Sequence, residues 1–313
     1  MKYAIKKILT MIVTLLAVSI LVFFAFSIIP GNPAISKLGT EATPEKIAAL
    51  SHEMGLDKPM LERFFQWVIN IFKGDFGISY SYSQPVTELL SEKLATTLIL
   101  SVMAIILTVL ISFPVGIYMA RKSDSKLDVV LTTINQIVMA IPSFFSGILL
   151  TLIFGVTFKL FTPGAFVSYK YDFFKCVGYM FFPALSIALP KVSMVSKLLK
   201  DTAIFEAGKD YVRTAYSRGN RTKAVFYNHV LKNALIPVVT FLGMTFADII
   251  AGSIIVEQVF SIPGLGRILL TSISGRDYPV VEAIILLLAT FVVVSNLIVD
   301  LLYHKLDPRI HVD

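Results

Sequence analysis

The side chains best suited to carry a function lie in a polar and basic stretch, residues 198–234, which we call the basic segment. Its middle reads Asp210-Tyr211-Val212-Arg213-Thr214-Ala215-Tyr216-Ser217-Arg218-Gly219, and its end continues as His229-Val230-Leu231-Lys232-Asn233-Ala234-Leu235-Ile236-Pro237. Such residues could dock on another protein, or the segment could be a solvated loop attracted to anionic lipid headgroups. We expect one or two helices here, with breaks at Gly208 and Gly219.

A second candidate is Asp248, a carboxylate within an apolar stretch, where it is costly unless it faces protein or water. Its neighbours one helical turn away are mostly small or polar: Met244, Thr245, Ala251 and Gly252. We therefore expect this stripe to point into a helix bundle, where Asp248 could line a path and attract positive charge. The alternative is an ion pair with Lys191, although we expect Lys191 to lie nearer the cytoplasmic side.

The sequence predicts no enzyme active site and no metal centre. The single Cys176 excludes an intramolecular disulfide, and the histidines are scattered at His52, His229, His304 and His311. The Gly208-Lys209 pair lacks the glycine and hydroxyl residues of a phosphate-binding loop. No paired carboxylates or nucleophile-base set occurs in the apolar stretches, so we predict no catalytic residue.

The elements that must position these residues are membrane-spanning helices. Hydrophobic residues make up 56% of the 313 residues, which is far above the usual content of a water-soluble domain. A bilayer core needs about 20 apolar residues of helix. Six windows of this kind occur, at residues 8–29, 97–119, 129–156, 178–197, 235–256 and 283–303. Pro114, Pro142, Pro183 and Pro190 fall in or near them, as tolerated kinks or as points of gating.

The distribution of Lys and Arg predicts the orientation. With the N-terminus inside, the inner segments carry 16 of these residues and the outer segments 11 over more chain, so both termini are placed in the cytoplasm. We treat the net charge of +7 as this topology signal and expect no nucleic-acid partner. The resulting division is a first span at 1–29, an extracytoplasmic part with short interfacial helices at 30–96, a core at 97–304 and a tail at 305–313.

The motifs in this frame resemble the membrane subunits of ABC importers, in the oligopeptide/dipeptide/nickel permease family. The coupling segment of that family reads D-Y-V-R-T-A-x-x-K-G and then H-x-L-K/R-N-A-L-I-P, with Arg218 here in the place of the family's usual Lys. Further matching blocks follow in order: Ile29-Pro30-Gly31-Asn32-Pro33-Ala34, Gly55-Leu56-Asp57-Lys58-Pro59, Gly74-Asp75-Phe76-Gly77-Ile78-Ser79, Glu257-x-x-Phe260-x-x-Pro263-Gly264-Leu265-Gly266, Arg276-Asp277-Tyr278-Pro279 and Asp307-Pro308-Arg309.

The resemblance implies an all-helical type I importer permease with six spans in a bacterial inner membrane. It implies a second homologous permease, two ABC ATPase subunits that bind ATP and Mg, and an extracellular or periplasmic binding protein for peptides or similar solutes. Coupling to the ATPase falls on seven residues: Asp210, Tyr211, Arg213, Thr214, Ala215, Arg218 and Gly219. Glu257 is either a helix-end cap or a contact of the outer gate or binding protein. A nickel or metal-chelate permease and a secondary transporter remain the alternatives.

Overall fold

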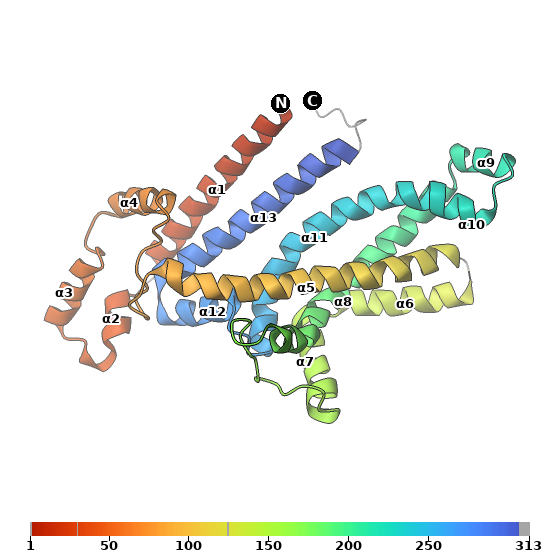
Figure 1. Ribbon diagram of the computed structural model, residues 1–313. Coiled ribbons are helices and arrows are strands. Elements are labelled where there is room, and N and C mark those ends of the chain that lie inside the picture. Colours follow the sequence, from red (N-terminus) through yellow and green to blue (C-terminus); the bar gives the residue numbers. More distant parts are fainter. Residues whose placement is uncertain (1, 30, 124, 307–313) are drawn as a thin grey trace. The chain divides into compact units, whose positions relative to one another are not determined.

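The computed structural model describes residues 2–29, 31–123 and 125–306, and every regular element in these ranges is a helix (Figure 1). This confirms the predicted all-α class. Chain contacts divide the molecule into two compact units, the first of residues 1–97 and 262–297, the second of residues 98–261 and 298–313. The first unit thus joins the N-terminal part to residues 262–297, which the sequence-based division places in the core. That division stays a prediction.

The first unit holds the first long helix, a set of short helices and most of the last long helix. Its elements are α1 (Lys2–Ile28), α2 (Pro33–Leu38), a 3-10 turn (Gly39–Glu41), α3 (Pro44–Glu53), α4 (Met60–Phe72), the start of α5, α12 (Leu265–Gly275) and most of α13 (Tyr278–Leu306). The short helices predicted between residues 30 and 96 are therefore present. Thr43 caps α3 by accepting a hydrogen bond from the Lys46 backbone N–H at 3.4 Å.

A buried carboxylate ties this unit together. Asp277 is fully buried just before α13, and it accepts hydrogen bonds from the backbone N–H groups of Tyr80 at 2.9 Å and Ser81 at 3.1 Å. The Ser79 hydroxyl donates a third bond at 2.5 Å. Because a charged acceptor in a dry site binds its donors strongly, these contacts fix the loop after α4 against the start of α13.

The second unit holds long helices joined by short segments. Its elements are α5 (Val86–Arg121, shared with the first unit), α6 (Lys126–Ala140), α7 (Ser143–Leu150) with a π-helical turn (Thr151–Thr157), α8 (Phe173–Ala207), α9 (Asp210–Ser217), α10 (Thr222–Val225) with a π-helical turn (Phe226–Val230), and α11 (Leu231–Val259). Within this unit α8 packs along α11, α7 and α6. The α6 helix also donates from the Asn135 amide to the Ser193 carbonyl of α8 at 2.7 Å.

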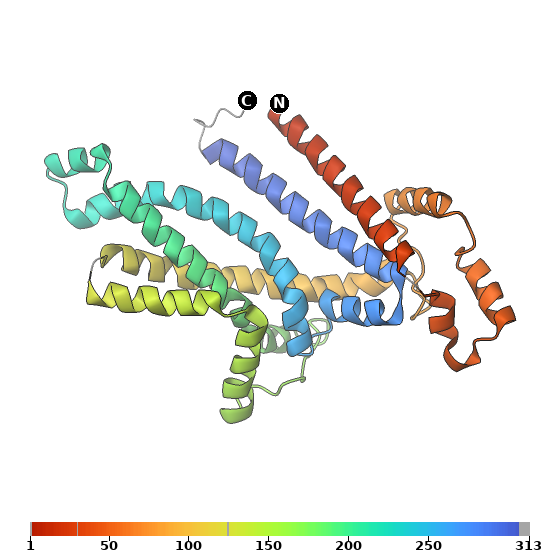
Figure 2. The same cartoon turned by 180° about the vertical axis from the view of Figure 1, so that it is seen from behind.

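The third predicted span is not one helix. Five helices in the described part of the chain are long and apolar enough to cross a membrane, and the count is six if α6 and α7 form one broken span. These two helices meet at 101°, a bend that is visible from both sides (Figure 1 and Figure 2). The sequence analysis treated Pro142 as a kink, but the residue before a proline is driven out of the helical region. Ile141 accordingly has an extended backbone with ψ 122°, and the helix stops.

The other prolines are accommodated inside continuous helices. Pro114 lies within α5, and Pro183 and Pro190 lie within α8. This agrees with the tolerated-kink interpretation for these three positions.

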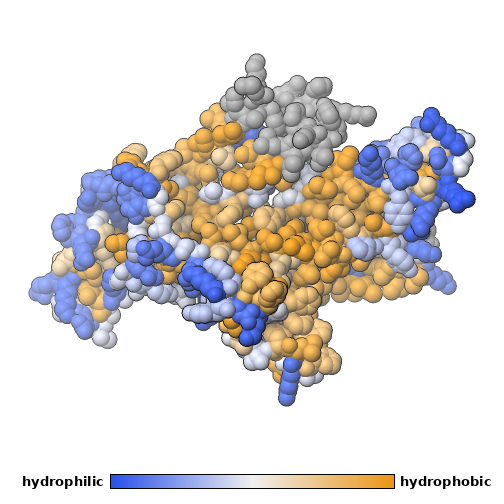
Figure 3. Space-filling model, in the orientation of Figure 1, coloured by the Kyte–Doolittle hydropathy of each residue, from blue (hydrophilic) through white to orange (hydrophobic). Residues whose placement is uncertain are grey.

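The basic segment is more continuous with the spans than the sequence suggested. The predicted breaks at Gly208 and Gly219 are confirmed, since α8 ends at Ala207 and α9 ends at Ser217. Residues 198–207 and 222–234, however, belong to the ends of α8 and of the α10–α11 helix, so only α9 is a separate helix. Hydrophilic residues gather over α9 and α10 and over α2 to α4, while hydrophobic residues cover the long helices (Figure 3).

Candidate functional site

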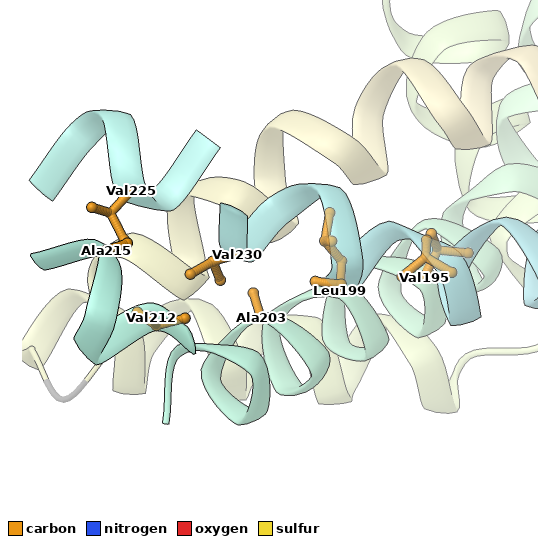
Figure 4. Close-up of a cluster of buried hydrophobic side chains, with 9 residues drawn as sticks. Val195, Leu199, Ala203, Val212, Ala215, Val225 and Val230 are labelled. Carbon is orange, nitrogen blue, oxygen red and sulfur yellow. The ribbon is translucent and has the colours of Figure 1, made fainter. Parts of the chain in front are cut away.

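The α9 helix is held by a buried apolar cluster, which we call the α9 cluster. It joins three residues of α8, two of α9 and four of the α10–α11 helix: Val195, Leu199, Ala203, Val212, Ala215, Val225, Val230, Ala234 and Val238. Figure 4 shows Val212 and Ala215 pointing from α9 toward the side chains of the neighbouring helices. Three residues apart, they lie on one face of the helix, and this face attaches α9 to both long helices.

Hydrogen bonds add a polar clamp at the start of α9. The Tyr211 hydroxyl donates to the Glu206 carboxylate of α8 at 2.7 Å and accepts from the Asn233 amide of α11 at 3.1 Å. Lys209 also contacts Glu206, at 2.6 Å. Burial, and the bond donated to Glu206, raise the pKa of the Tyr211 phenol above its ordinary value, so the phenol keeps its proton at neutral pH.

The two glycines that bound α9 are not equivalent. Gly219 has a φ of +78°, in the left-handed region that favours glycine, and its N–H bonds the Tyr216 carbonyl at 2.9 Å. Gly208 has an ordinary helical backbone with φ −78°. Only the turn at Gly219 therefore requires the conformational freedom of glycine.

The structure divides the seven predicted coupling residues into two sets. Tyr211 is half-buried and Ala215 is 6% exposed, so both face the chain itself. The Ala215 methyl group is part of the α9 cluster, so its contact with an ATPase stays a prediction that its burial in this chain does not favour. The remaining residues are exposed on α9 and the turn that follows it: Asp210, Arg213, Thr214, Arg218 and Gly219.

The exposed set carries both signs of charge. Asp210 and Arg213 lie 3.5 Å apart, and each side chain is more than three-quarters exposed, so the ion pair adds little stability. Asp210 lies in the first turn of α9, where a negative charge is favourable, and Arg218 follows the last turn. These charges are available for a partner.

Sequence reasoning missed the residues that support this surface. Glu206, next to the predicted break at Gly208, and Asn233, within the second motif block, were not singled out as partners of Tyr211. The signal for the anchors was present in the spacing of Val212 and Ala215, the apolar face of an otherwise polar helix.

Asp248 of α11 forms the ion pair that the sequence analysis gave as the alternative. Its carboxylate lies 3.0 Å from the Lys191 ammonium of α8. The Lys191 side chain therefore bridges α8 and α11, and its predicted place nearer the cytoplasmic side stays a prediction. Asp248 keeps 65% of its side chain exposed, whereas Lys191 keeps 19%.

The predicted stripe around Asp248 is divided, because Met244, Asp248 and Ala251 are exposed whereas Thr245 is buried. Along α11 the exposed residues follow helical spacing: Met244, Asp248, Ala251, Ile255 and Gln258. The opposite face, with Thr245, Ile249 and Ser253, is buried. Asp248 and Lys191 line a pocket of about 280 Å³ next to the break at Pro142. The carboxylate thus faces a concave surface that this chain alone leaves open.

A second ion pair joins α6 to α8, and sequence reasoning missed it. The Lys200 ammonium contacts the Asp128 carboxylate at 2.6 Å and the Thr132 hydroxyl at 3.0 Å. Both charged side chains are about nine-tenths buried. Lys200 had been counted as a cytoplasmic loop cation, but the continuation of α8 places it against α6 instead.

Glu257 lies in the last turn of α11 and is fully buried. A helix-end position is therefore confirmed, but the side chain offers no exposed surface for a binding protein in this conformation. A role at the outer gate stays a prediction.

The chain brings few metal-ligand side chains together. In the ranges that the structure describes, no three His, Cys, Asp or Glu residues are grouped as a metal site. His52 is exposed and bonds Asp57 at 2.7 Å, which holds the pKa of that carboxyl below its usual range. His229 is exposed on a π-helical turn, and its carbonyl accepts a bond from Asn233. His311 lies outside the described residues.

Two family models match almost the whole chain. Residues 112–312 match the binding-protein-dependent transport system inner membrane component, and residues 1–101 match the N-terminal part of such membrane components. Together they cover both compact units, including α9 and the Asp248 stripe.

Individual relatives agree with these matches. The chain is 35% identical to the glutathione transport system permease protein GsiC of Salmonella choleraesuis over 311 residues, which is 99% of each chain. It is 33% identical to the oligopeptide transport system permease protein AppB of Bacillus subtilis, over 98% of each chain. A solved amino acid ABC transporter shares the fold, with a TM-score of 0.51 at 18% identity over 70% of this chain and 92% of that chain. These findings confirm the type I importer permease fold, and the chain belongs to the family of inner membrane components of binding-protein-dependent transport systems, as an ABC importer permease.

Proposed function

We propose that the chain forms one half of the translocation pathway of an ATP-driven importer for peptides or similar small solutes, and that α9 docks on an ATPase subunit. The observation that carries this proposal is the division of α9 into two faces. One face is embedded in the α9 cluster, and the other presents Asp210, Arg213 and Thr214 to the exterior. An exposed charged face on a helix fixed to two spans suits the transfer of motion from a partner.

The proposed partners are those expected for a permease subunit of an ABC importer. Two ABC ATPases bind ATP and Mg and hydrolyse ATP, a second homologous permease completes the pathway, and an external binding protein delivers cargo. Both termini lie in the cytoplasm of the bacterial cell, on the same side as α9, as the Lys and Arg distribution favours. Peptide cargo is supported by the relatives named as oligopeptide and glutathione permeases.

The Asp248 carboxylate, in this proposal, lies on the pathway. Asp248 lies within a span, and 65% of its side chain is not covered by this chain. Contact of the charged carboxylate with lipid would cost several kcal/mol. A second permease that covers this face, with water and cargo between, removes that cost. Cargo with a positive group, such as a peptide amino terminus, is then attracted to the pocket beside Pro142.

Reversal of the exposed charges of α9 tests the docking surface. We expect Arg213→Glu together with Arg218→Glu to lower recovery of the ATPase subunits with the tagged permease about tenfold, because the reversed charges no longer complement the charges of the partner. Pull-down and uptake in the same membranes measure this. The matched control is Lys73→Glu with Lys159→Glu, which reverses two exposed charges elsewhere. Wild-type recovery and uptake in the Arg213/Arg218 variant would contradict ATPase docking here.

The turn after α9 gives a second test. Gly219→Val should abolish uptake, because a β-branched residue at φ +78° is strained, while Gly219→Asn should retain most uptake, since Asn tolerates this region. Gly208→Val is the comparison, with an ordinary φ and only ordinary contact for a Cβ. Uptake is measured at equal amounts of membrane-inserted chain. Equal losses for Gly219→Val and Gly208→Val would show that the left-handed turn is not required.

The role of Asp248 is separable from its ion pair. Asp248→Asn should lower uptake of cationic peptides more than of neutral peptides, and the double variant Lys191→Met/Asp248→Asn should keep this altered selectivity while removing the unpaired lysine. Competition between peptides of equal length and different charge measures it. If the single variant loses both cargoes equally and the double variant recovers both, the pair is structural only and the pathway role fails.

A further inference from the structure

A groove in the first unit runs along α1 and α13 beside α4, and we call it the α1–α13 groove. Its polar end is formed by two adjoining pockets of about 200 and 230 Å³ that share Arg63, Tyr278 and Glu282. Its apolar end is a pocket of about 230 Å³ lined by residues of the same three helices: Ile12, Leu15, Leu16, Ser19, Val68, Ile71, Phe72, Leu286 and Thr290.

The residues that line the two ends lie on the same faces of α13 and α1. Glu282, Leu286 and Thr290 follow each other at four-residue intervals on one face of α13. On α1, Phe23 of the polar end and Ser19 and Leu15 of the apolar end follow the same rule. One step of four residues advances a helix by about 6 Å, so the lining changes from charged to apolar residues within a few turns of α1 and α13.

The polar end holds groups that no other described side chain satisfies. Glu282 is buried, with 7% of its surface exposed, and Arg63 lines the same two pockets. Among the described residues, none donates a hydrogen bond to the Glu282 carboxyl, and the buried Tyr278 hydroxyl has no partner. Arg63 itself stacks at 5.9 Å from the Phe23 ring. Buried groups of this kind in native proteins are normally paired, which points to a ligand.

A neighbouring phenol is also available as a donor. Tyr80 lines the same pocket, and burial raises its pKa to about 12, so its hydroxyl remains protonated at neutral pH. Trp67, the single tryptophan of the chain, lines the pocket as well and contacts Phe23. The pocket therefore combines the acids Asp75 and Glu282, the bases Lys58 and Arg63, hydroxyl donors and aromatic walls.

We propose that the α1–α13 groove binds a phospholipid whose headgroup carries a primary ammonium, such as phosphatidylethanolamine. The ammonium donates hydrogen bonds to Glu282, the phosphate accepts from Arg63 and the Tyr278 hydroxyl, and an acyl chain occupies the apolar end beside Leu286. On the orientation proposed above, the lipid comes from the outer leaflet.

The shape of the groove favours a lipid over a soluble zwitterion. An amino acid or short peptide would satisfy Glu282 and Arg63 but would leave the apolar pocket along two spans empty. The exposed face of α4 also suits a membrane surface, since Phe65 and Phe72 are 62% and 83% exposed. A phosphatidylcholine headgroup has no N–H to donate, which separates the two lipids chemically.

The test is the lipid retained by the purified importer complex. Complexes are exchanged into nanodiscs that contain equal phosphatidylethanolamine and phosphatidylcholine, extracted in mild detergent, and their bound lipids quantified by mass spectrometry. We expect the wild-type complex to retain phosphatidylethanolamine about tenfold in excess, and Glu282→Gln to bring the ratio close to one. Glu62→Gln, an exposed carboxylate on α4, is the matched control and should keep the preference.

A second variant tests the apolar end without a change of charge. Leu286→Trp should fill the pocket and reduce the retained phosphatidylethanolamine several-fold. Equal retention of the two lipids by the wild-type complex, or an unchanged ratio in Glu282→Gln, would overturn the proposal. The proposal would also be overturned if excess trialanine displaced the preferred lipid without changing the total amount of bound lipid. The groove would then be a peptide site.

Discussion

The α9 cluster is the contact that holds α9 on α8 and on the α10–α11 helix. A helix of eight residues is not stable by itself in water, since nucleation costs more than so few hydrogen bonds return. Burial of Val212 and Ala215 against α8 and the α10–α11 helix supplies the missing stabilisation, at about 1 kcal/mol or more for each side chain. The helical state of α9 is thus inseparable from its attachment to the two long helices.

This attachment has a mechanical consequence. Close-packed apolar interiors transmit displacement rather than absorb it, so a force on the exposed face of α9 moves the ends of α8 and α11 together. These same helices carry Lys191 and Asp248, and α8 also bears Lys200, which is paired with Asp128 of α6. A partner that pulls on α9 therefore acts on the helices that border the pocket at Pro142. The break there separates α6 from α7 and offers a place where the packing can change.

Much of the fold was predictable because lipid leaves the backbone few choices. Apolar windows of sufficient length located the five long helices, and the turn glycine at Gly219 located the end of α9. The break at Pro142 was visible in the sequence but was read as a kink, since the pattern alone does not say whether neighbouring helices support the freed backbone groups. The Lys191–Asp248 pair was kept only as the alternative, because counting residues from the ends of the predicted spans placed Lys191 nearer the cytoplasmic side. That count ignored how far α8 and α11 extend.

The faces of helices were harder to predict than their positions. Ala215 sits inside the family motif, yet its side chain anchors α9, and only the three-dimensional packing separates it from Thr214. Likewise, small and polar neighbours suggested that Asp248 points inward, but the larger apolar residues on the opposite face, such as Ile249 and Ile250, compete for the core more strongly. No feature of the sequence around Glu257 predicts that its side chain is fully buried.

The central claim is that one face of α9 meets the ATPase while the adjacent face is closed inside this chain. It is tested most directly by cysteine cross-linking in the assembled importer, in a Cys176→Ala background, with a short bifunctional thiol reagent. We expect Thr214→Cys to form a covalent adduct with an ATPase subunit and Ala215→Cys to form none. An adduct from Ala215→Cys, or adducts from Thr214→Cys only with the external binding protein, would contradict it.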